Sequence, residues 1–256
     1  MFNKTINIDE TILKIKTDIN IDNIYDNIYN SIFNWRNNIK NYSKTHPNFL
    51  KSHKPLNFHK SLNFQKGSKI IEKMHYASEI AEIGPMGAVA GTISQFTLEN
   101  LLNEGLNYSI VNNGGDLAFF NNNEDKNIIC GIYAGSSEIS GKIAFKFSPS
   151  DKQYGLCTSS GTVGYSFSYG RADAVSIIAQ EASIADTLAT SIANEVKGND
   201  DKIAIEQGLK QAKKFKKYFI GGIIIVNNQI GTIGKLPEII SLDDGNLDEY
   251  IQDTIL

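Results

Sequence analysis

The sequence lacks the features of a secreted or membrane-spanning protein. It has only 2 cysteines in 256 residues, too few for a disulfide scaffold, which favours a reducing compartment. No apolar run approaches the length of a membrane span. Charged side chains from Lys4 to Asp18 are scattered through the beginning of the chain and leave no room for the apolar core of a signal peptide. We therefore expect a cytoplasmic protein.

The chain also lacks an excess of positive charge. Its 25 lysines and arginines are outnumbered by 28 aspartates and glutamates, so no global basic field attracts nucleic acid. Hydrophobic residues make up 41% of the chain and charged residues 21%, as in a typical globular domain. A chain of this length holds one large domain or two small fused ones. We expect neither a nucleic-acid partner nor a membrane partner.

Histidine is scarce as well, yet three of the 4 histidines lie in one segment, 45–67. The spacing of His46, His53 and His59 matches no compact zinc pattern, and no cysteine is nearby. The segment also shows little periodicity. We therefore expect an irregular surface loop, and the sequence leaves open whether that loop acts as a lid.

The most informative stretch lies in the second half of the chain. A Ser/Thr/Gly turn at 158–162 is followed by a strand-like run at 174–179 and by a helix of small residues at about 183–195. Within this helix Asp186 and Thr190 are four positions apart and share a face. Their oxygens are hard ligands of the kind that Mg²⁺ accepts. Ordinary solvent exposure is the alternative, and the spacing alone favours it.

Another run of small residues opens the helix predicted at about 85–104. Gly87, Ala88 and Gly91 lie in its first turns, directly after a Gly-Pro break. Helix N-termini bind anions, and small side chains leave the backbone N–H groups accessible. Close packing of the helix against a sheet explains the same residues equally well, so both interpretations stay open.

A hairpin signal follows this helix. Asn112 and Asn113, then Gly114 and Gly115, separate two apolar runs, and Asp116 stands at the exit of the turn. Asn-Gly between apolar runs is the strongest short-range hairpin signal and suffices to explain the glycines. Glycines also let a ligand approach the backbone closely, which makes the turn a candidate binding element.

Two segments share one order of predicted elements, namely helix, helix, strand, turn and strand. They span 68–120 and 183–233, and both turns contain the letters Ile-Val-Asn-Asn. We interpret them as two similar halves of an α+β domain, each an antiparallel sheet with helices packed on one face. A cleft between such halves is a natural ligand site. The last segment, 237–256, is predicted to be an acidic tail.

The order of these motifs resembles that of the ApbE-like superfamily, which includes flavin transferases that move FMN from FAD onto Ser or Thr of a partner protein. The similarity covers roughly residues 85–233. It includes the small-residue helix, the Gly-Gly-Asp hairpin, a Thr-Ser-Gly turn matched by 159–161, and an Ala-Asp-x-x-Ala-Thr helix matched by 185–190. The resemblance implies a T-fold-related α+β architecture in a single domain.

The resemblance also implies a cofactor site. Asp186 and Thr190 would bind Mg²⁺ together with a backbone carbonyl near Gly87 and Ala88. An FAD or FMN nucleotide would lie along the Gly-Gly-Asp turn. The implied flavin contacts are completed by Gly91, Asn113, Gly114, Gly115, Asp116, Ser159, Ser160, Gly161 and Thr162.

The sequence departs from the transferases in two places. Their His-Ile-Ile-Asp-Pro block is missing, and Tyr165 and Ser166 lie near its place, while the Lys-Gly of their small-residue helix is Ala90-Gly91 here. The Gly-Pro-Met and Ser-Gly-Thr-Val-Gly patterns are similar instead to a cytoplasmic, largely uncharacterised branch of the superfamily in archaea and anaerobic bacteria. Some members of that branch are linked to the insertion of sulfide-derived sulfur during homocysteine formation. The resemblance therefore implies a protein partner in sulfur metabolism.

These residues are compatible with three functions. The first is a Mg²⁺-dependent flavin- or nucleotide-binding protein of sulfur metabolism, in which Cys157 is the thiol to test, although free cysteines are usually small buried residues. The second is an FMN transferase with Asp173 or Tyr165 as the base. The third is a non-catalytic scaffold that has lost its ligand. The missing His block favours the first or third function, and the retained Asp186 and Thr190 favour the first over the third.

Overall fold

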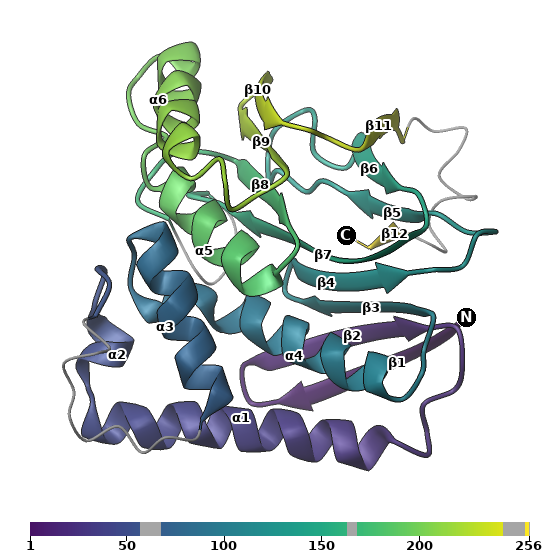
Figure 1. Ribbon diagram of the computed structural model, residues 1–256. Helices are drawn as coiled ribbons and strands as arrows, with labels where there is room; N and C mark the ends of the chain where they lie inside the picture. The colour runs from purple at the N-terminus through teal and green to yellow at the C-terminus, as the bar shows by residue number, and fades with distance from the viewer. Residues whose placement is uncertain (57–67, 163–167, 243–253, 256) are drawn as a thin grey trace.

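An eight-stranded antiparallel sheet forms the centre of the protein (Figure 1). The computed structural model describes residues 1–56, 68–162, 168–242 and 254–255. Each strand of this sheet runs antiparallel to its neighbours. In spatial order the strands are β1 (Phe2–Ile8), β2 (Thr11–Thr17), β3 (Tyr108–Asn113), β4 (Asp116–Asn121), β7 (Ser150–Ser159), β8 (Ala174–Ala179), β9 (Gly221–Val226) and β10 (Gln229–Gly234).

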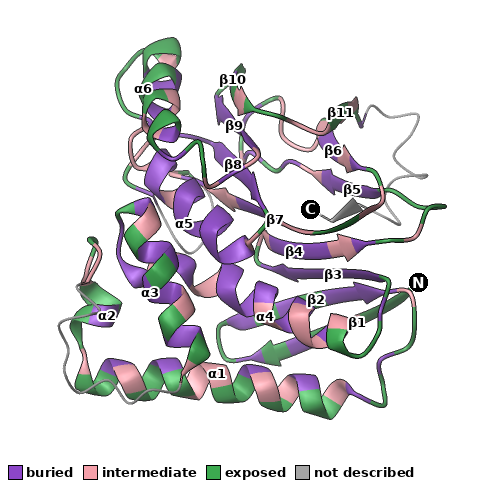
Figure 2. Cartoon of the chain, viewed as in Figure 1, coloured by how far each residue is buried: buried purple, intermediate pink, exposed green. Residues whose placement is uncertain are grey.

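Helices cover one face of this sheet. Figure 2 shows α5 mostly buried, whereas α1 and α6 expose their outer faces. Every residue of α5 except Thr190 is buried. None of the described helices is long and apolar enough to cross a membrane. The helices are α1 (Tyr25–Thr45), α2 (Asn48–Lys51), α3 (Lys69–Ala81), the 3₁₀ turn η2 (Pro85–Ala88), α4 (Val89–Asn103), α5 (Ala182–Ala193) and α6 (Asp201–Lys214).

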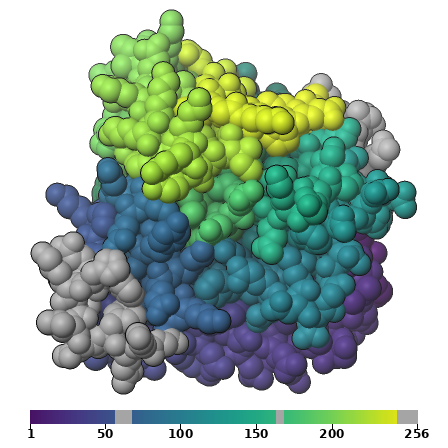
Figure 3. Space-filling model, viewed as in Figure 1, coloured from purple at the N-terminus to yellow at the C-terminus, as the bar shows by residue number. Residues whose placement is uncertain are grey.

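A smaller sheet packs on the opposite face. Its strands, in spatial order, are β11 (Glu238–Ser241), β6 (Ile143–Phe147), β5 (Ile128–Gly131) and β12 (Thr254–Ile255). Alternate residues of the central strands point to the two layers: in β9, Ile224 packs with the helices, and Ile223 and Ile225 pack with the smaller sheet. Because both faces are covered, β3, β8 and β9 are buried at every position. In the space-filling view the segment of β10 and β11 (yellow) lies beside α6 (light green) (Figure 3).

The predicted α+β class is confirmed, since the central sheet is antiparallel, the smaller sheet is antiparallel apart from the pair β5–β12, and the helices lie on one face of the central sheet. The strand predicted at 174–179 matches β8 at every residue, and the helix predicted at about 183–195 is α5. The hairpin predicted around Gly114 joins β3 to β4. The two predicted repeats contribute the hairpins β3–β4 and β9–β10 to one sheet, and their relation as an internal repeat stays a prediction.

Three details need correction. The turn predicted at 158–162 begins later, because β7 continues through Ser159 and pairs with β8 up to that residue. The segment 45–67 contains the short helix α2, which is anchored by the fully buried Phe49. The predicted acidic tail contains β11, which pairs antiparallel with β6 at the edge of the smaller sheet and packs Ile240 against a small buried cluster.

Candidate functional site

The carboxylate of Asp186 caps the first turn of a neighbouring helix. α4 begins at Val89 and has no side-chain cap of its own. The backbone N–H of Gly91 donates a hydrogen bond of 2.8 Å to Asp186 Oδ2, so α5 supplies the missing acceptor. A Cβ atom on Gly91 would lie 2.3 Å from the carbonyl oxygen of Ala182, so a glycine is needed for this close approach. The small residues of α4 therefore provide both close packing and a site for a carboxylate, that of Asp186.

Two further groups lie close to this carboxylate. Asp116 is the first residue of β4, and Cys157 lies on the neighbouring strand β7. Burial raises the pKa of Asp116 to about 7. Burial and the charge of Asp116 together raise the pKa of Asp186 well above its ordinary value. The two acids therefore share one region of negative potential.

This pair of acids has no positive partner in the described part of the chain. No lysine, arginine or histidine within those residues forms an ion pair with Asp116 or Asp186. Thr190 lies one turn after Asp186 on α5 and adds a hydroxyl oxygen. No group of three or more His, Cys, Asp or Glu residues within the described ranges is arranged around a single point. The side-chain groups that could bind a cation here are therefore the carboxylates of Asp116 and Asp186 and the hydroxyl of Thr190.

These groups line a cavity of about 980 Å³, a volume at the upper end of the range for ligand pockets. Of the residues predicted to contact a flavin or a metal, those that line the cavity are Gly87, Asn113, Gly114, Gly115, Asp116, Ser159, Ser160, Asp186 and Thr190. The structure therefore brings together four stretches that are far apart in the sequence: the η2 turn before α4, the β3–β4 turn, the end of β7 and α5.

The β3–β4 turn presents backbone to this cavity. Gly114 and Gly115 have φ values of 66° and 104°, which glycine adopts without strain. A Cβ atom at either position would meet no atom within 4 Å. The side-chain oxygen of Asn112 accepts a hydrogen bond of 2.8 Å from the N–H of Gly115 and orders the turn. The turn is therefore both a hairpin and an open ligand-facing element.

Four residues of the predicted flavin site do not line the cavity. Ala88 is fully buried, and its carbonyl accepts a 2.6 Å hydrogen bond from the Thr92 hydroxyl. Gly91 is enclosed between α4 and α5. Gly161 packs on the backbone of Gly170, so it cannot carry a side chain, and Thr162 is not among the lining residues, although its hydroxyl donates a hydrogen bond to Asp173.

The predicted catalytic residues are placed less favourably. Asp173 lines the cavity, but its Oδ2 accepts a 2.6 Å hydrogen bond from the N–H of Asn227 and its Oδ1 accepts one of 3.1 Å from the Thr162 hydroxyl. These contacts anchor the β9–β10 turn, which is a structural role. Tyr165 lies outside the described residues.

Cys157 is also placed as a structural residue. Its side chain is fully buried and donates a hydrogen bond of 3.3 Å to the carbonyl oxygen of Ala182. Burial, with the charges of Asp116 and Asp186, raises the pKa of its thiol well above the ordinary value. A thiol held in the protonated form is a poor nucleophile, so this geometry argues against the predicted catalytic role.

Sequence reasoning missed part of the cavity rim. Leu50 lines it from α2, and Ser52 and His53 line it from the segment after α2. The Tyr169 hydroxyl lies 2.9 Å from His53 Nδ1, which joins this segment to the loop that follows β7. The histidine cluster was the signal for this segment in the sequence. It indicated a loop but did not indicate which residue His53 would contact.

The chain is an ApbE-like protein by fold and by sequence. A sequence model of the family described as AbpE bacteria matches residues 3–216. The chain belongs to that family, which confirms the predicted superfamily.

Relatives in methanogenic archaea extend over most of the chain. The UPF0280 protein of Methanothermobacter thermautotrophicus is 44% identical over 208 residues, which are 81% of this chain and 77% of the relative. The UPF0280 protein of Methanococcus aeolicus is 40% identical over 246 residues, which are 95% and 94% of the two chains.

Two solved structures share the fold. The flavin transferase ApbE from Vibrio cholerae aligns with a TM-score of 0.55 and 11% identity, covering 93% of this chain and 97% of the other. The flavinyl transferase ApbE of Pseudomonas stutzeri in its apo form aligns with a TM-score of 0.55 and 11% identity, covering 91% and 93%. At such low identity the likeness establishes the fold alone.

Proposed function

We propose that the cavity binds a flavin nucleotide, FAD or FMN, together with a Mg²⁺ ion held by Asp186 and Thr190. The observation that carries the proposal is the acid pair formed by the half-buried Asp116 and the buried Asp186, which has no ion-pair partner among the described residues. Two neighbouring carboxylates partly or wholly withdrawn from water, without a counter-charge, are unfavourable by themselves and are relieved by a cation. Carboxylate and hydroxyl oxygens suit Mg²⁺, which keeps its remaining positions for water and phosphate.

The shape of the cavity supports the choice of ligand. The open backbone of Gly114 and Gly115 allows a nucleotide to approach the β3–β4 turn in the cavity that Asp186 of α5 also lines. The fold is shared with proteins that are named flavin transferases, which favours a flavin over other nucleotides. A bound Mg²⁺ would neutralise the charge of the phosphates. The role of the chain is to hold the oxygens of Asp186 and Thr190 in place for it.

FMN transfer is the second candidate, favoured by the same likeness to transferases. The contacts of Asp173 argue against it as a base, since both of its oxygens already accept hydrogen bonds. Release of AMP from FAD in the presence of Mg²⁺ and a Ser- or Thr-containing acceptor protein would establish transfer. With no AMP released, the protein is a flavin-binding protein without this activity.

A role in sulfur metabolism, in the cytoplasm and with a protein partner, stays a proposal supported by the family resemblance alone. In our proposal no cysteine acts as a nucleophile. Cys157 is fully buried, and Cys130, which borders the cavity, is 1% exposed. Burial raises the pKa of the Cys130 thiol to about 12.

A fluorescence titration of FAD and FMN tests the proposal. The full chain is titrated with and without Mg²⁺, in the wild type, in Asp186→Asn and in Asp22→Asn, which removes an exposed carboxylate paired with Lys4. We expect Mg²⁺-dependent binding in the wild type and in Asp22→Asn, and its loss in Asp186→Asn. No binding of either flavin to the wild type would reject the proposal and favour the scaffold function.

A further inference from the structure

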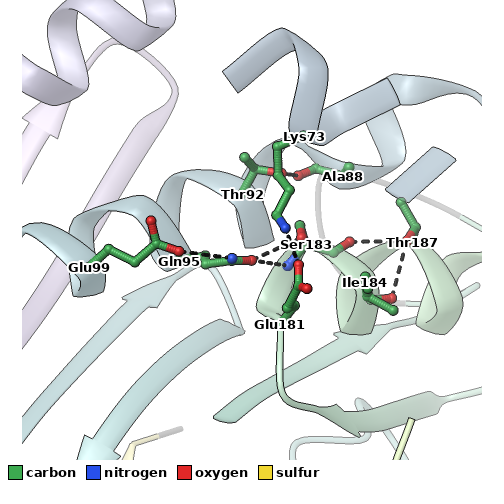
Figure 4. A network of polar contacts seen from close by, with 9 residues as sticks. All are labelled: Lys73, Ala88, Thr92, Gln95, Glu99, Glu181, Ser183, Ile184 and Thr187. Carbon is green, nitrogen blue, oxygen red and sulfur yellow. Dashed lines mark hydrogen bonds and ion pairs between the residues drawn. The ribbon is translucent and has the colours of Figure 1, made fainter. Parts of the chain in front are cut away.

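Gln95 of α4 caps the first turn of α5. Helix α5 starts after Glu181 and has no side-chain cap of its own. Gln95 Oε1 accepts a hydrogen bond of 3.2 Å from the N–H of Ser183 and one of 2.9 Å from its hydroxyl (Figure 4). The two residues are 6% and 0% exposed, so no bulk water is available to replace this acceptor.

This contact and the contact of Asp186 are reciprocal. Gly91 and Gln95 are one turn apart on α4, and Ser183 and Asp186 are nearly one turn apart on α5. The N–H of Gly91 donates to Asp186, and the N–H of Ser183 donates to Gln95. Each helix therefore caps the N-terminus of the other. Two such contacts fix both the rotation and the translation of α5 against α4.

Neighbouring groups hold the Gln95 amide in this orientation. Its Nε2 donates a hydrogen bond of 3.0 Å to Glu99 Oε1, which leaves the oxygen directed at Ser183 (Figure 4). Lys73 of α3 forms an ion pair with Glu181, the residue before α5 (Figure 4). The start of α5 is thus held from two other helices.

We propose that Gln95 is a positioning residue for the cation site. By holding Ser183 it fixes the first turn of α5, and with it the carboxylate of Asp186, one of whose oxygens is already engaged by Gly91. The inference rests on the proposed function, because it requires that Asp186 binds Mg²⁺. It assigns to a residue outside the cavity lining a role in metal affinity.

Metal binding by the full chain tests this role without any assay of activity. Mn²⁺ serves as the probe, free Mn²⁺ is measured by electron paramagnetic resonance, and competition by Mg²⁺ shows that the two ions share the site. The variant Gln95→Met keeps the length of the side chain and removes the acceptor. We expect it to weaken Mn²⁺ binding about tenfold, as is typical when a group that orients a metal ligand is lost.

Two matched variants separate positioning from general packing. Thr97→Val alters the same helix at a buried hydroxyl with no hydrogen-bond partner in the described part of the protein, and it should leave Mn²⁺ affinity unchanged. The double variant Gln95→Glu, Glu99→Gln exchanges donor and acceptor and still offers an oxygen to Ser183. This double variant should restore the Mn²⁺ affinity to within about threefold of the wild type. A threefold change is smaller than the tenfold loss expected for Gln95→Met, which corresponds to about 1.4 kcal/mol.

Each outcome is decisive. Equal Mn²⁺ affinity in the wild type and in Gln95→Met, or no recovery in the double variant, overturns the role of Gln95 while the proposed function stands. Absence of Mn²⁺ binding in the wild type, or binding that survives Asp186→Asn, removes the proposed function and this inference together. If Gln95→Met does not fold, Ser183→Ala replaces it, because it removes only the 2.9 Å hydroxyl contact. A weaker loss in the same direction then supports the inference, and unchanged affinity overturns it.

Discussion

The carboxyl groups of Asp116 and Asp186 come from β4 and α5, far apart in the sequence, yet burial and the charge of Asp116 together raise the pKa of Asp186. They lie on the helix-covered side of the central sheet, next to the fully buried Cys157. This juxtaposition gives the cavity a negative potential that a cation would relieve.

The first prediction concerns pH. Asp116 has a pKa of about 7 in the folded protein and an ordinary value of 3.8 when exposed. Between these values the folded state holds a proton that the unfolded state has lost, so stability is lost as pH rises from about 4 through 7. Urea unfolding in EDTA should show this fall, and Asp116→Asn should make it smaller. Identical pH profiles for the two proteins would contradict the assignment, and addition of Mg²⁺ should reduce the fall in the wild type.

The second prediction separates the two threonines of α5. Thr190 lines the cavity, whereas the Thr187 hydroxyl donates a hydrogen bond of 3.0 Å to the carbonyl of Ser183 within the same helix. Thr190→Val should raise the Mg²⁺ concentration needed for flavin binding about tenfold, a loss of about 1.4 kcal/mol. Thr187→Val is the matched control and should leave the Mg²⁺ midpoint, the Mg²⁺ concentration at half-maximal flavin binding, unchanged. Equal Mg²⁺ midpoints in the wild type and both variants would exclude Thr190 as a ligand.

The third prediction concerns the close approach of α4 and α5. In Gly91→Ala the new Cβ atom would lie 2.3 Å from the Ala182 carbonyl oxygen and 2.7 Å from Asp186 Cβ, so one helix must move. We expect a loss of about 1–3 kcal/mol in the free energy of unfolding, together with weaker Mg²⁺ binding.

The control for this variant is Gly231→Ala on β10. There the added Cβ atom would lie 2.3 Å from Ile205 Cγ2, on a hairpin that contributes no residue to the cavity lining. Its stability should fall while its Mg²⁺ midpoint stays at the wild-type value. A Gly91→Ala protein with normal Mg²⁺ binding would show that the position of Asp186 does not depend on this contact.

The fourth prediction concerns thiol reactivity. Burial raises the pKa of both cysteines, and the charges of Asp116 and Asp186 raise that of Cys157 further. Ellman's reagent should therefore label neither of the 2 thiols in the native protein and both in denaturant. Cys157→Ala should retain flavin binding. Rapid labelling of one thiol under native conditions would reopen a role for cysteine in sulfur chemistry.

Local patterns in the sequence were sufficient for much of the fold. The strand-like run at 174–179 predicts a strand, and these limits agree with β8 in the structure. The Asn-Gly pair predicts the β3–β4 hairpin, where two glycines adopt positive φ values. The i to i+4 spacing of Asp186 and Thr190 predicts that they share a face of α5. Each of these features depends on residues a few positions apart.

The partners of these residues were decided by tertiary structure. Asp173 was a reasonable candidate base in the sequence, but the β9–β10 turn brings the N–H of Asn227 within 2.6 Å of it and gives it a structural role. The histidine cluster indicated a loop, but only the fold places His53 beside Tyr169 at the rim of the cavity. Neither contact has a local signature, because the partners are distant in the sequence.

The sequence by itself determined the periods, the turns and the chemical types of the side chains, since these follow from backbone geometry within a few residues. Only the tertiary structure decided that Asp186 would cap α4, that Gln95 would cap α5 and that Asp116 would stand beside Asp186. Those pairings depend on how the helices pack on the sheet. That packing is set by the whole core, which is built from helices and strands that are distant from one another in the sequence.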